Sequence, residues 1–142
     1  MQHKNIWMVL VLVFAGIQLS ACQKTAAERP TEHPVTVELI EGSELSRVFL
    51  TEKAMERLAV RTDKVGEARS QKTVPYSALI YDTHGKTWVY TSPQERMFVR
   101  HQVTVDRIEG DLVYLSEGPP SGTVVASVAV AEIYGAEFGI GH

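Results

Sequence analysis

Residues 97–108 read Met-Phe-Val-Arg-His-Gln-Val-Thr-Val-Asp-Arg-Ile, with a period of two in side-chain character. Successive side chains of a β-strand point to opposite faces of its sheet. The two expected faces hold Val99, His101, Val103 and Val105 on the apolar side, and Arg100, Gln102, Thr104 and Asp106 on the polar side. This alternation predicts a half-buried strand, around which the rest of the chain is interpreted.

Further strand candidates flank this stretch, each bounded by turn residues. They are residues 77–82, 87–91, 112–116 and 123–130. The turn at 83–86 contains Gly85, and glycine adopts a positive φ at little cost, so this turn predicts a hairpin. Short strands at this spacing predict an antiparallel sheet closed into a small barrel or roll.

The preceding segment adds strand candidates at 35–39, 47–50 and 60–65. Between the last two, Thr51 is placed to cap a short helix over residues 52–58, because its hydroxyl can accept from a first-turn amide. Residues 65–72 are polar, contain a glycine and are interpreted as a loop. The predicted fold class is therefore mainly β, a small antiparallel barrel or roll with one short helix.

The N-terminus has the layout of an export signal. A cationic start precedes an apolar run that ends in Leu19-Ser20-Ala21-Cys22, which contains the only cysteine. The run is shorter than the roughly 20 residues that a spanning helix needs and has the proportions of a secretory signal peptide. The tetrapeptide resembles the lipobox of bacterial lipoproteins, which implies cleavage before Cys22 and lipidation of its thiol. The alternative is an uncleaved anchor with an incidental cysteine.

These signals divide the chain into four parts. We expect a signal peptide over 1–21, a flexible tether over 22–34, a β domain over 35–131 and a C-terminal tail over 132–142. The whole chain carries a formal net charge of −3, and no cluster of basic residues alternates with aromatic ones. This composition does not indicate a nucleic-acid partner.

Four segments carry a resemblance to a known family. Residues 74–91 read VPYSALIYDTHGKTWVYT, 98–118 read FVRHQVTVDRIEGDLVYLSEG and 121–142 read SGTVVASVAVAEIYGAEFGIGH. They resemble the membrane-proximal part of the periplasmic adaptor subunits of RND-type efflux pumps, also called membrane fusion proteins. Residues 48–65, VFLTEKAMERLAVRTDKV, are similar to the family's segment before its lipoyl domain.

The resemblance implies a shortened adaptor. Full-length members insert a lipoyl domain, a helical hairpin and most of a β-barrel where this chain has only residues 65–72. The family builds its membrane-proximal domain from both ends of the polypeptide, so that domain can persist without the insert. The implied partners are an RND-type transporter and a full-length adaptor, with a lipid anchor in the membrane and the domain facing the periplasm of a Gram-negative cell envelope.

Metal-binding and catalytic interpretations have weaker support. The histidines His33, His84, His101 and His142 lack metal-ligand spacing, and no Cys-x2-Cys motif occurs. We expect His84 in a turn and His101 in the core, and keep both only as minor metal candidates. No nucleophile elbow, phosphate loop or His-Glu-x-x-His motif is present. We therefore expect no enzyme activity and no cofactor besides the lipid on Cys22.

Two aromatic residues of the tail, Tyr134 and Phe138, have two interpretations. They anchor a flexible tail into a partner, since aromatic side chains often carry interface energy, or the tail folds back over a sheet edge. The expected function is a non-catalytic accessory protein that docks on an RND-type transporter. The alternatives are a periplasmic metal-binding lipoprotein and a truncated adaptor that has lost its role.

Overall fold

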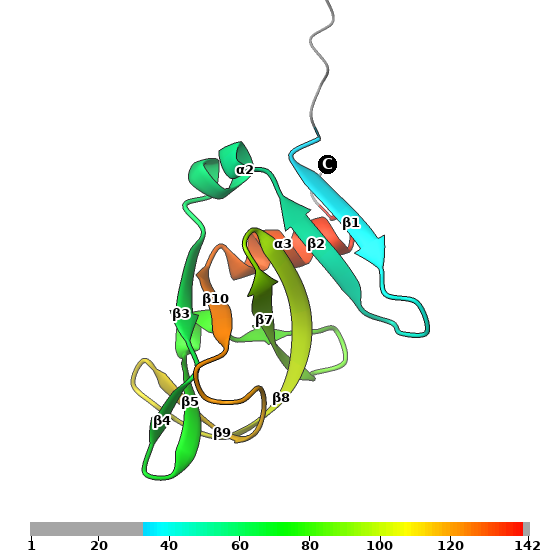
Figure 1. Cartoon of the computed structure of the whole chain (residues 1–142). Helices are drawn as coiled ribbons and strands as arrows, with labels where there is room; N and C mark the ends of the chain where they lie inside the picture. The colour runs from blue at the N-terminus through cyan, green and yellow to red at the C-terminus, as the bar shows by residue number, and fades with distance from the viewer. Residues whose placement is uncertain (1–32, 141–142) are drawn as a thin grey trace, which may run out of the picture. The chain divides into compact units, whose positions relative to one another are not determined.

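The computed structural model describes residues 33–140 (Figure 1). The signal peptide, Cys22, most of the expected tether and His142 lie outside the described residues. The described chain contains ten strands, two α-helices and one turn of 3₁₀ helix. In order, they are β1 (Val35–Leu39), β2 (Ser46–Leu50), α2 (Glu52–Arg57), β3 (Arg61–Lys64), β4 (Gly66–Ala68), β5 (Gln71–Pro75), η1 (Tyr76–Ala78), β6 (Ile80–Tyr81), β7 (Thr87–Gln94), β8 (Met97–Glu109), β9 (Leu112–Glu117), β10 (Val124–Val128) and α3 (Val130–Glu137).

The strands form one antiparallel sheet that curls into a half-barrel. Its main path runs β3-β10-β7-β8-β9-β5-β4, while β1 joins through β2 and β6 joins through β7. The long strand β8 connects two regions, because its first half pairs with β2 and β7 and its second half pairs with β9. The end strands β3 and β4 are not paired with each other, so the predicted antiparallel barrel or roll is confirmed as a mainly β, antiparallel curled sheet, with the hydrogen bonding of a half-barrel.

The N-terminal strands pair with strands far along the chain. In the β2–β8 ladder, Val48 lies opposite Phe98, and in the β3–β10 ladder, Asp63 lies opposite Val125. Figure 1 shows β2 beside β8 and β3 beside β10, although about 50 to 60 residues separate the partners in sequence. The N-terminal and C-terminal segments are therefore parts of one folded unit.

The core consists of two clusters on opposite faces of the central strands. One lies under the helices and is formed by Val48, Leu50, Ala54, Tyr90, Phe98, Ala126, Val130 and Ile133. The other fills the curl of the sheet and is formed by Val65, Val74, Ala78, Val89, Val103, Val113, Leu115 and Val125. Neighbouring residues of one strand, such as Val89 and Tyr90, thus enter different clusters. Both faces of β7 are buried there, which explains why Trp88, Val89 and Tyr90 are apolar without alternation.

The segment 65–72, predicted as a loop, is instead the start of a hairpin. Strand β4 pairs with β5, and Arg69 and Ser70 form the turn with φ of 51° and 61°. Two residues with positive φ suit a tight hairpin, but this turn usually contains glycine or asparagine. The absence of either residue removed the signal by which the hairpin would have been recognised.

A second helix, α3, replaces the expected flexible tail. It crosses the predicted boundary between residues 131 and 132, and its Ile133 is fully buried in the core. The tail thus folds back, as one of our two interpretations required, but α3 covers a sheet face and not an edge. The N-terminal helix α2 follows the prediction closely: the Thr51 hydroxyl accepts a hydrogen bond from the amide of Ala54.

Candidate functional site: a pocket around a buried arginine

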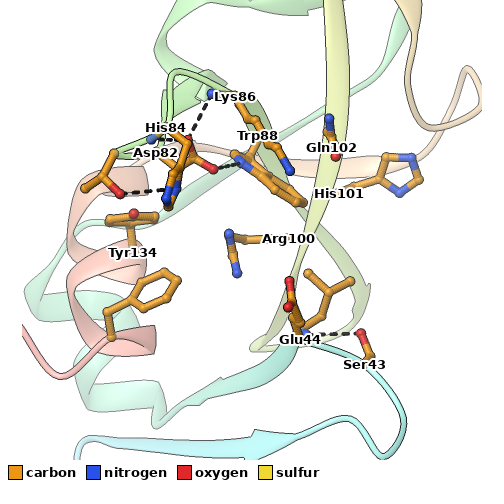
Figure 2. Close-up of a pocket in the computed structure, with 13 residues that line it drawn as sticks. Ser43, Glu44, Asp82, His84, Lys86, Trp88, Arg100, His101, Gln102 and Tyr134 are labelled. Carbon is orange, nitrogen blue, oxygen red and sulfur yellow. Dashed lines mark hydrogen bonds between the residues drawn. The ribbon is translucent and has the colours of Figure 1, made fainter.

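A pocket of about 830 Å³ opens on the face of the sheet that carries α3 (Figure 2). Its walls come from the β1–β2 loop, the β6–β7 turn, strands β7 and β8, and helix α3. Arg100, from β8, lies in the middle of these walls, and Figure 2 shows its guanidinium group among Trp88, Tyr134 and Glu44. Pockets of this size commonly hold small molecules.

The Arg100 side chain is held by a buried ion pair. Its Nε lies 3.0 Å from Oε1 and 2.8 Å from Oε2 of Glu137, at the C-terminal end of α3. The side chains of Arg100 and Glu137 are only 8% and 2% exposed. A buried charge is stable only when it is paired and hydrogen-bonded, and this contact also joins α3 to β8.

The Glu137 carboxylate receives a second hydrogen bond, from Tyr90 in β7. The Tyr90 hydroxyl donates to Glu137 Oε2 over 2.5 Å. Burial, together with the negative charge of Glu137, raises the pKa of Tyr90 well above its usual range, so Tyr90 remains a donor. Tyr90 and Arg100 lie opposite each other in the β7–β8 ladder, which brings both side chains to the same face beneath α3.

Two aromatic rings pack against the guanidinium group of Arg100. Its Cζ lies 4.5 Å from the centre of the Trp88 ring and 4.8 Å from the centre of the Phe138 ring. Tyr134 extends this aromatic wall, with its ring centre 4.7 Å from that of Phe138. Cation–π contacts at such distances stabilise the cation, more strongly where water is excluded.

Asp82 fixes the orientation of Trp88. Its Oδ2 accepts from Trp88 Nε1 over 3.0 Å, and its Oδ1 accepts from the backbone amides of His84 and Lys86 over 2.8 and 2.9 Å. Desolvation alone would raise the pKa of Asp82, but these hydrogen bonds outweigh it and lower the pKa below its ordinary value of 3.8. Asp82, at the start of the turn, therefore stays ionised, and its carboxylate oxygens accept hydrogen bonds from the His84 and Lys86 amides and from Trp88.

Arg100 lines the pocket, and its guanidinium group lies in the middle of it in Figure 2. The hydrogen bonds that Arg100 makes within residues 33–140 use Nε. Within residues 33–140, the buried side-chain polar atom that lacks a hydrogen-bond partner is Ser127 Oγ. Neither Nη atom of Arg100 is an atom of this kind. Each Nη group therefore keeps some contact with solvent and donates no hydrogen bond within residues 33–140.

The predicted site residues have different outcomes. Tyr134 and Phe138 both line the pocket, and Phe138 is 47% exposed. His84 is exposed in its turn as expected. His101 shares a face with the buried Val103, as the alternation predicted, but the prediction that it is a core histidine was wrong, because it is exposed. Partial burial and the charge of Lys72 lower the pKa of His101.

The two histidines do not form a joint site. In Figure 2 the His101 ring points away from Arg100, whereas the His84 ring lies beside Tyr134. Among residues 33–140, no three histidine, cysteine, aspartate or glutamate side chains are grouped so as to hold a metal ion. The same residues contain no helix long and apolar enough to cross a membrane.

Sequence reasoning missed Arg100, which lines the pocket, and Glu137, which pairs with it. Arg100 was assigned to a solvated strand face, where it alternates with apolar neighbours. The strand register could have revealed the position of Arg100. A hairpin turn near residues 95–96 places Arg100 opposite Tyr90, on the strand face that carries the rings of Trp88 and Tyr90. A lone arginine opposite aromatic residues indicates a buried cation.

Comparison with protein-family models finds no family that matches this chain, and comparison with curated proteins finds no match either.

Proposed function

We propose that this protein is a lipid-anchored, non-catalytic accessory protein of the Gram-negative cell envelope that docks on an RND-type transporter. In this proposal Cys22 carries the lipid, residues 23–34 span the distance from the membrane, and the β domain faces the periplasm. The resemblance to the membrane-proximal part of periplasmic adaptors, in the order of four sequence segments, is its starting point.

The observation that best supports the proposal is the pairing between the two ends of the chain. The strands β2 and β3 belong to the segment that resembles the adaptor's N-terminal portion, and they pair with β8 and β10, which belong to the C-terminal portion. A domain assembled from both ends of a longer polypeptide requires such pairings. Unpaired N-terminal strands would have removed the basis for comparing this chain with an adaptor.

The connection between β3 and β5 supports the same interpretation. Full-length adaptors carry their additional domains at this point, and here a hairpin turn at Arg69 and Ser70 links β4 to β5. The two segments that resemble the adaptor therefore approach each other without any of the inserted domains. Between β3 and β5 the chain holds none of the parts that bridge to an outer-membrane channel in full-length adaptors, so its proposed role is limited to the transporter face.

The β1–β2 hairpin offers an apolar surface for docking. Val37 and Leu39, two residues apart on one face of β1, are 40% and 78% exposed. Exposed apolar side chains that lie together on a surface are typical of protein contacts. The outer edge of β1 pairs with no other strand in the described residues.

Co-purification with the co-encoded RND-type transporter tests the proposal. The tagged full-length protein should retain the transporter in mild detergent, and Leu39→Asp should reduce the amount recovered several-fold. The matched control is Ile108→Asp, which changes another exposed apolar residue, 44% exposed near the far end of β8. Absence of any transporter component with the wild-type protein, or equal recovery with Leu39→Asp, contradicts the proposal.

Lipidation is tested separately by mass spectrometry of the membrane fraction. We expect a mature N-terminus at Cys22 with attached acyl chains, and loss of both the acyl chains and the cleavage before residue 22 in the Cys22→Ser protein. Multiple acyl chains hold a protein firmly, since each buried CH₂ contributes about 0.8 kcal/mol. An unmodified cysteine with the preceding residues still attached contradicts the lipid anchor.

A further inference from the structure

We propose that the pocket around Arg100 binds a small organic carboxylate, with the carboxylate on the two Nη groups of Arg100 and an apolar body against the aromatic wall. This inference stands on the pocket alone and does not depend on transporter docking.

The guanidinium group of Arg100 is already oriented for such a ligand. Glu137 occupies the Nε side of the guanidinium group, and the rings of Trp88 and Phe138 pack against the guanidinium group itself. We assign the ligand's carboxylate to the remaining edge of the guanidinium group, whose two Nη groups donate no hydrogen bond within the described residues. Two parallel N–H donors match the two oxygens of a carboxylate, which is why arginine recognises this group so often.

The other charges near Arg100 leave room for an anion. The carboxylates of Glu137 and Asp82 are both committed to donors of the protein itself. Lys86 in the β6–β7 turn lines the same pocket and makes no ion pair within 4.0 Å among the described residues. It adds a positive charge at the rim, where charge steers an anionic ligand toward its site.

Glu44 is the acidic side chain that opposes the ligand. It is exposed in the β1–β2 loop, lines the pocket and has no ion-pair partner within 4.0 Å among the described residues. Its negative charge weakens binding of any anion at Arg100. Removing that charge should therefore strengthen binding, which gives the proposal a test that does not damage the fold.

The apolar part of the ligand follows from the remaining walls. Tyr134, Phe138 and Leu45 line the pocket beside Arg100, and Phe138 is half exposed, so its ring is available to a ligand. A highly hydrated inorganic anion gains nothing from these rings. A carboxylate joined to an aromatic or aliphatic body satisfies both the Nη groups and the aromatic wall.

Fluorescence of Trp88 reports directly on this pocket. The chain contains two tryptophans, Trp7 and Trp88. Trp7 lies in the expected signal peptide, so the mature protein in detergent has Trp88 as its single reporter, and Trp7→Phe gives the same single reporter in any uncleaved protein. We expect a saturable change in emission on titration with benzoate, and no saturable change with the neutral isostere benzamide. Inorganic phosphate distinguishes a general anion site: binding as tight as that of benzoate would overturn the assignment to an organic carboxylate.

Variants separate binding at Arg100 from unspecific effects. Arg100→Lys keeps the charge but loses the paired donors and should weaken benzoate binding about tenfold. The matched control is Arg107→Lys, because Arg107 also stacks on an aromatic ring, with its Cζ 3.7 Å from the centre of Tyr114, outside the pocket. Benzoate binding by this control should equal that of the wild type.

Glu44→Gln keeps the proposal falsifiable if Arg100→Lys fails to fold, since Glu44 is exposed and makes no ion pair among the described residues. We expect Glu44→Gln to bind benzoate several-fold more tightly than the wild type, and Phe138→Ala to bind it more weakly. The proposal is overturned if benzoate gives no saturable signal, if benzamide gives the same signal, or if Glu44→Gln leaves the affinity unchanged.

Discussion

The ion pair between Arg100 and Glu137 is a buried contact that holds α3 on the sheet. Both side chains are almost fully buried, and Tyr90 adds a hydrogen bond to the same carboxylate. Removing one member of a buried ion pair costs more stability than the whole pair contributes, because the remaining charge is left buried without a partner. The stability of the domain should therefore be sensitive to Glu137.

Glu137→Gln should lower the free energy of unfolding by roughly 3 kcal/mol, near the lower end of the range for breaking a buried pair, because the Nη groups of Arg100 retain contact with water. Urea denaturation followed by circular dichroism measures this loss. The control is Glu132→Gln, which neutralises an exposed glutamate on the same helix. Equal losses in the two variants would show that the buried pair does not stabilise the fold.

Asp82 makes stability depend on pH in a predictable direction. Its folded-state pKa lies below the ordinary value of 3.8 because three donated hydrogen bonds favour the ionised form. A carboxylate with a lowered pKa contributes stability above its unfolded-state pKa and loses this contribution as the pH falls through the folded-state pKa.

Wild-type protein should accordingly be more stable than Asp82→Asn at pH 7, and this difference should disappear as the pH falls below 3.8. Urea unfolding of both proteins across this pH range measures the difference. Asp111→Asn serves as the control, since Asp111 is exposed and its side chain makes no hydrogen bond among the described residues. A difference independent of pH would contradict the role of the ionised Asp82.

Among the elements, α3 has the greatest influence on both the core and the pocket. Its Ile133 is fully buried in the core, Tyr134 and the adjoining Phe138 line the pocket, and Glu137 pairs with Arg100. Figure 1 shows α3 across the strands that carry the first core cluster. Loosening this helix should therefore destabilise the domain and open the pocket together.

Ile133→Ala should reduce the free energy of unfolding by roughly 2–5 kcal/mol, the range for removing a large aliphatic side chain from a core. The chain offers a chemically identical control in Ile140→Ala, since Ile140 is 65% exposed just beyond the same helix. Thermal unfolding compares the two variants. A loss for Ile133→Ala as small as that for Ile140→Ala would mean that α3 is not packed on the sheet in solution.

The sequence predicted those elements whose local signals agree with their tertiary environment. Strand β1 was expected at 35–39 and is observed there, and α2 begins at its predicted cap, Thr51. The period of two identified β8, and Gly85 identified the β6–β7 hairpin turn. In each case a residue preference and the final structure coincide.

The elements that were missed lack such signals. The helix α3 begins after Ala129, which adopts a left-handed φ of 65° and offers no capping side chain, and the helix contains Gly135. Because α3 was not expected, the strand face beneath it was taken to be solvated. The burial of Arg100 and the pocket around it depend on that helix, so local sequence signals were not sufficient to predict the site.

For the molecule as a whole, the decisive feature is that the chain's two ends form one sheet. The β4–β5 hairpin lies at an end of this sheet's main path, pairs only with β9 beyond itself, and takes no part in either pairing between the N-terminal and C-terminal strands. Its turn carries only an exposed contact between Arg69 and Glu109, with side chains 71% and 44% exposed, and such contacts contribute little. Additional chain is therefore expected to be tolerated at this turn.

A flexible twelve-residue Gly/Ser segment inserted between Arg69 and Ser70 should cost about 1–2 kcal/mol of unfolding free energy, mainly from loop closure. The same insertion between Glu95 and Arg96 should cost more, because the Arg96 carbonyl accepts a hydrogen bond of 2.9 Å from the Leu50 amide and so helps hold β2 beside β8. Both sites are hairpin turns with a non-glycine residue at positive φ, which makes the comparison a matched one. Urea denaturation gives the two losses, and a loss at Arg69–Ser70 equal to or larger than that at Glu95–Arg96 would contradict the view that the β4–β5 hairpin stands where a longer adaptor carries its additional domains.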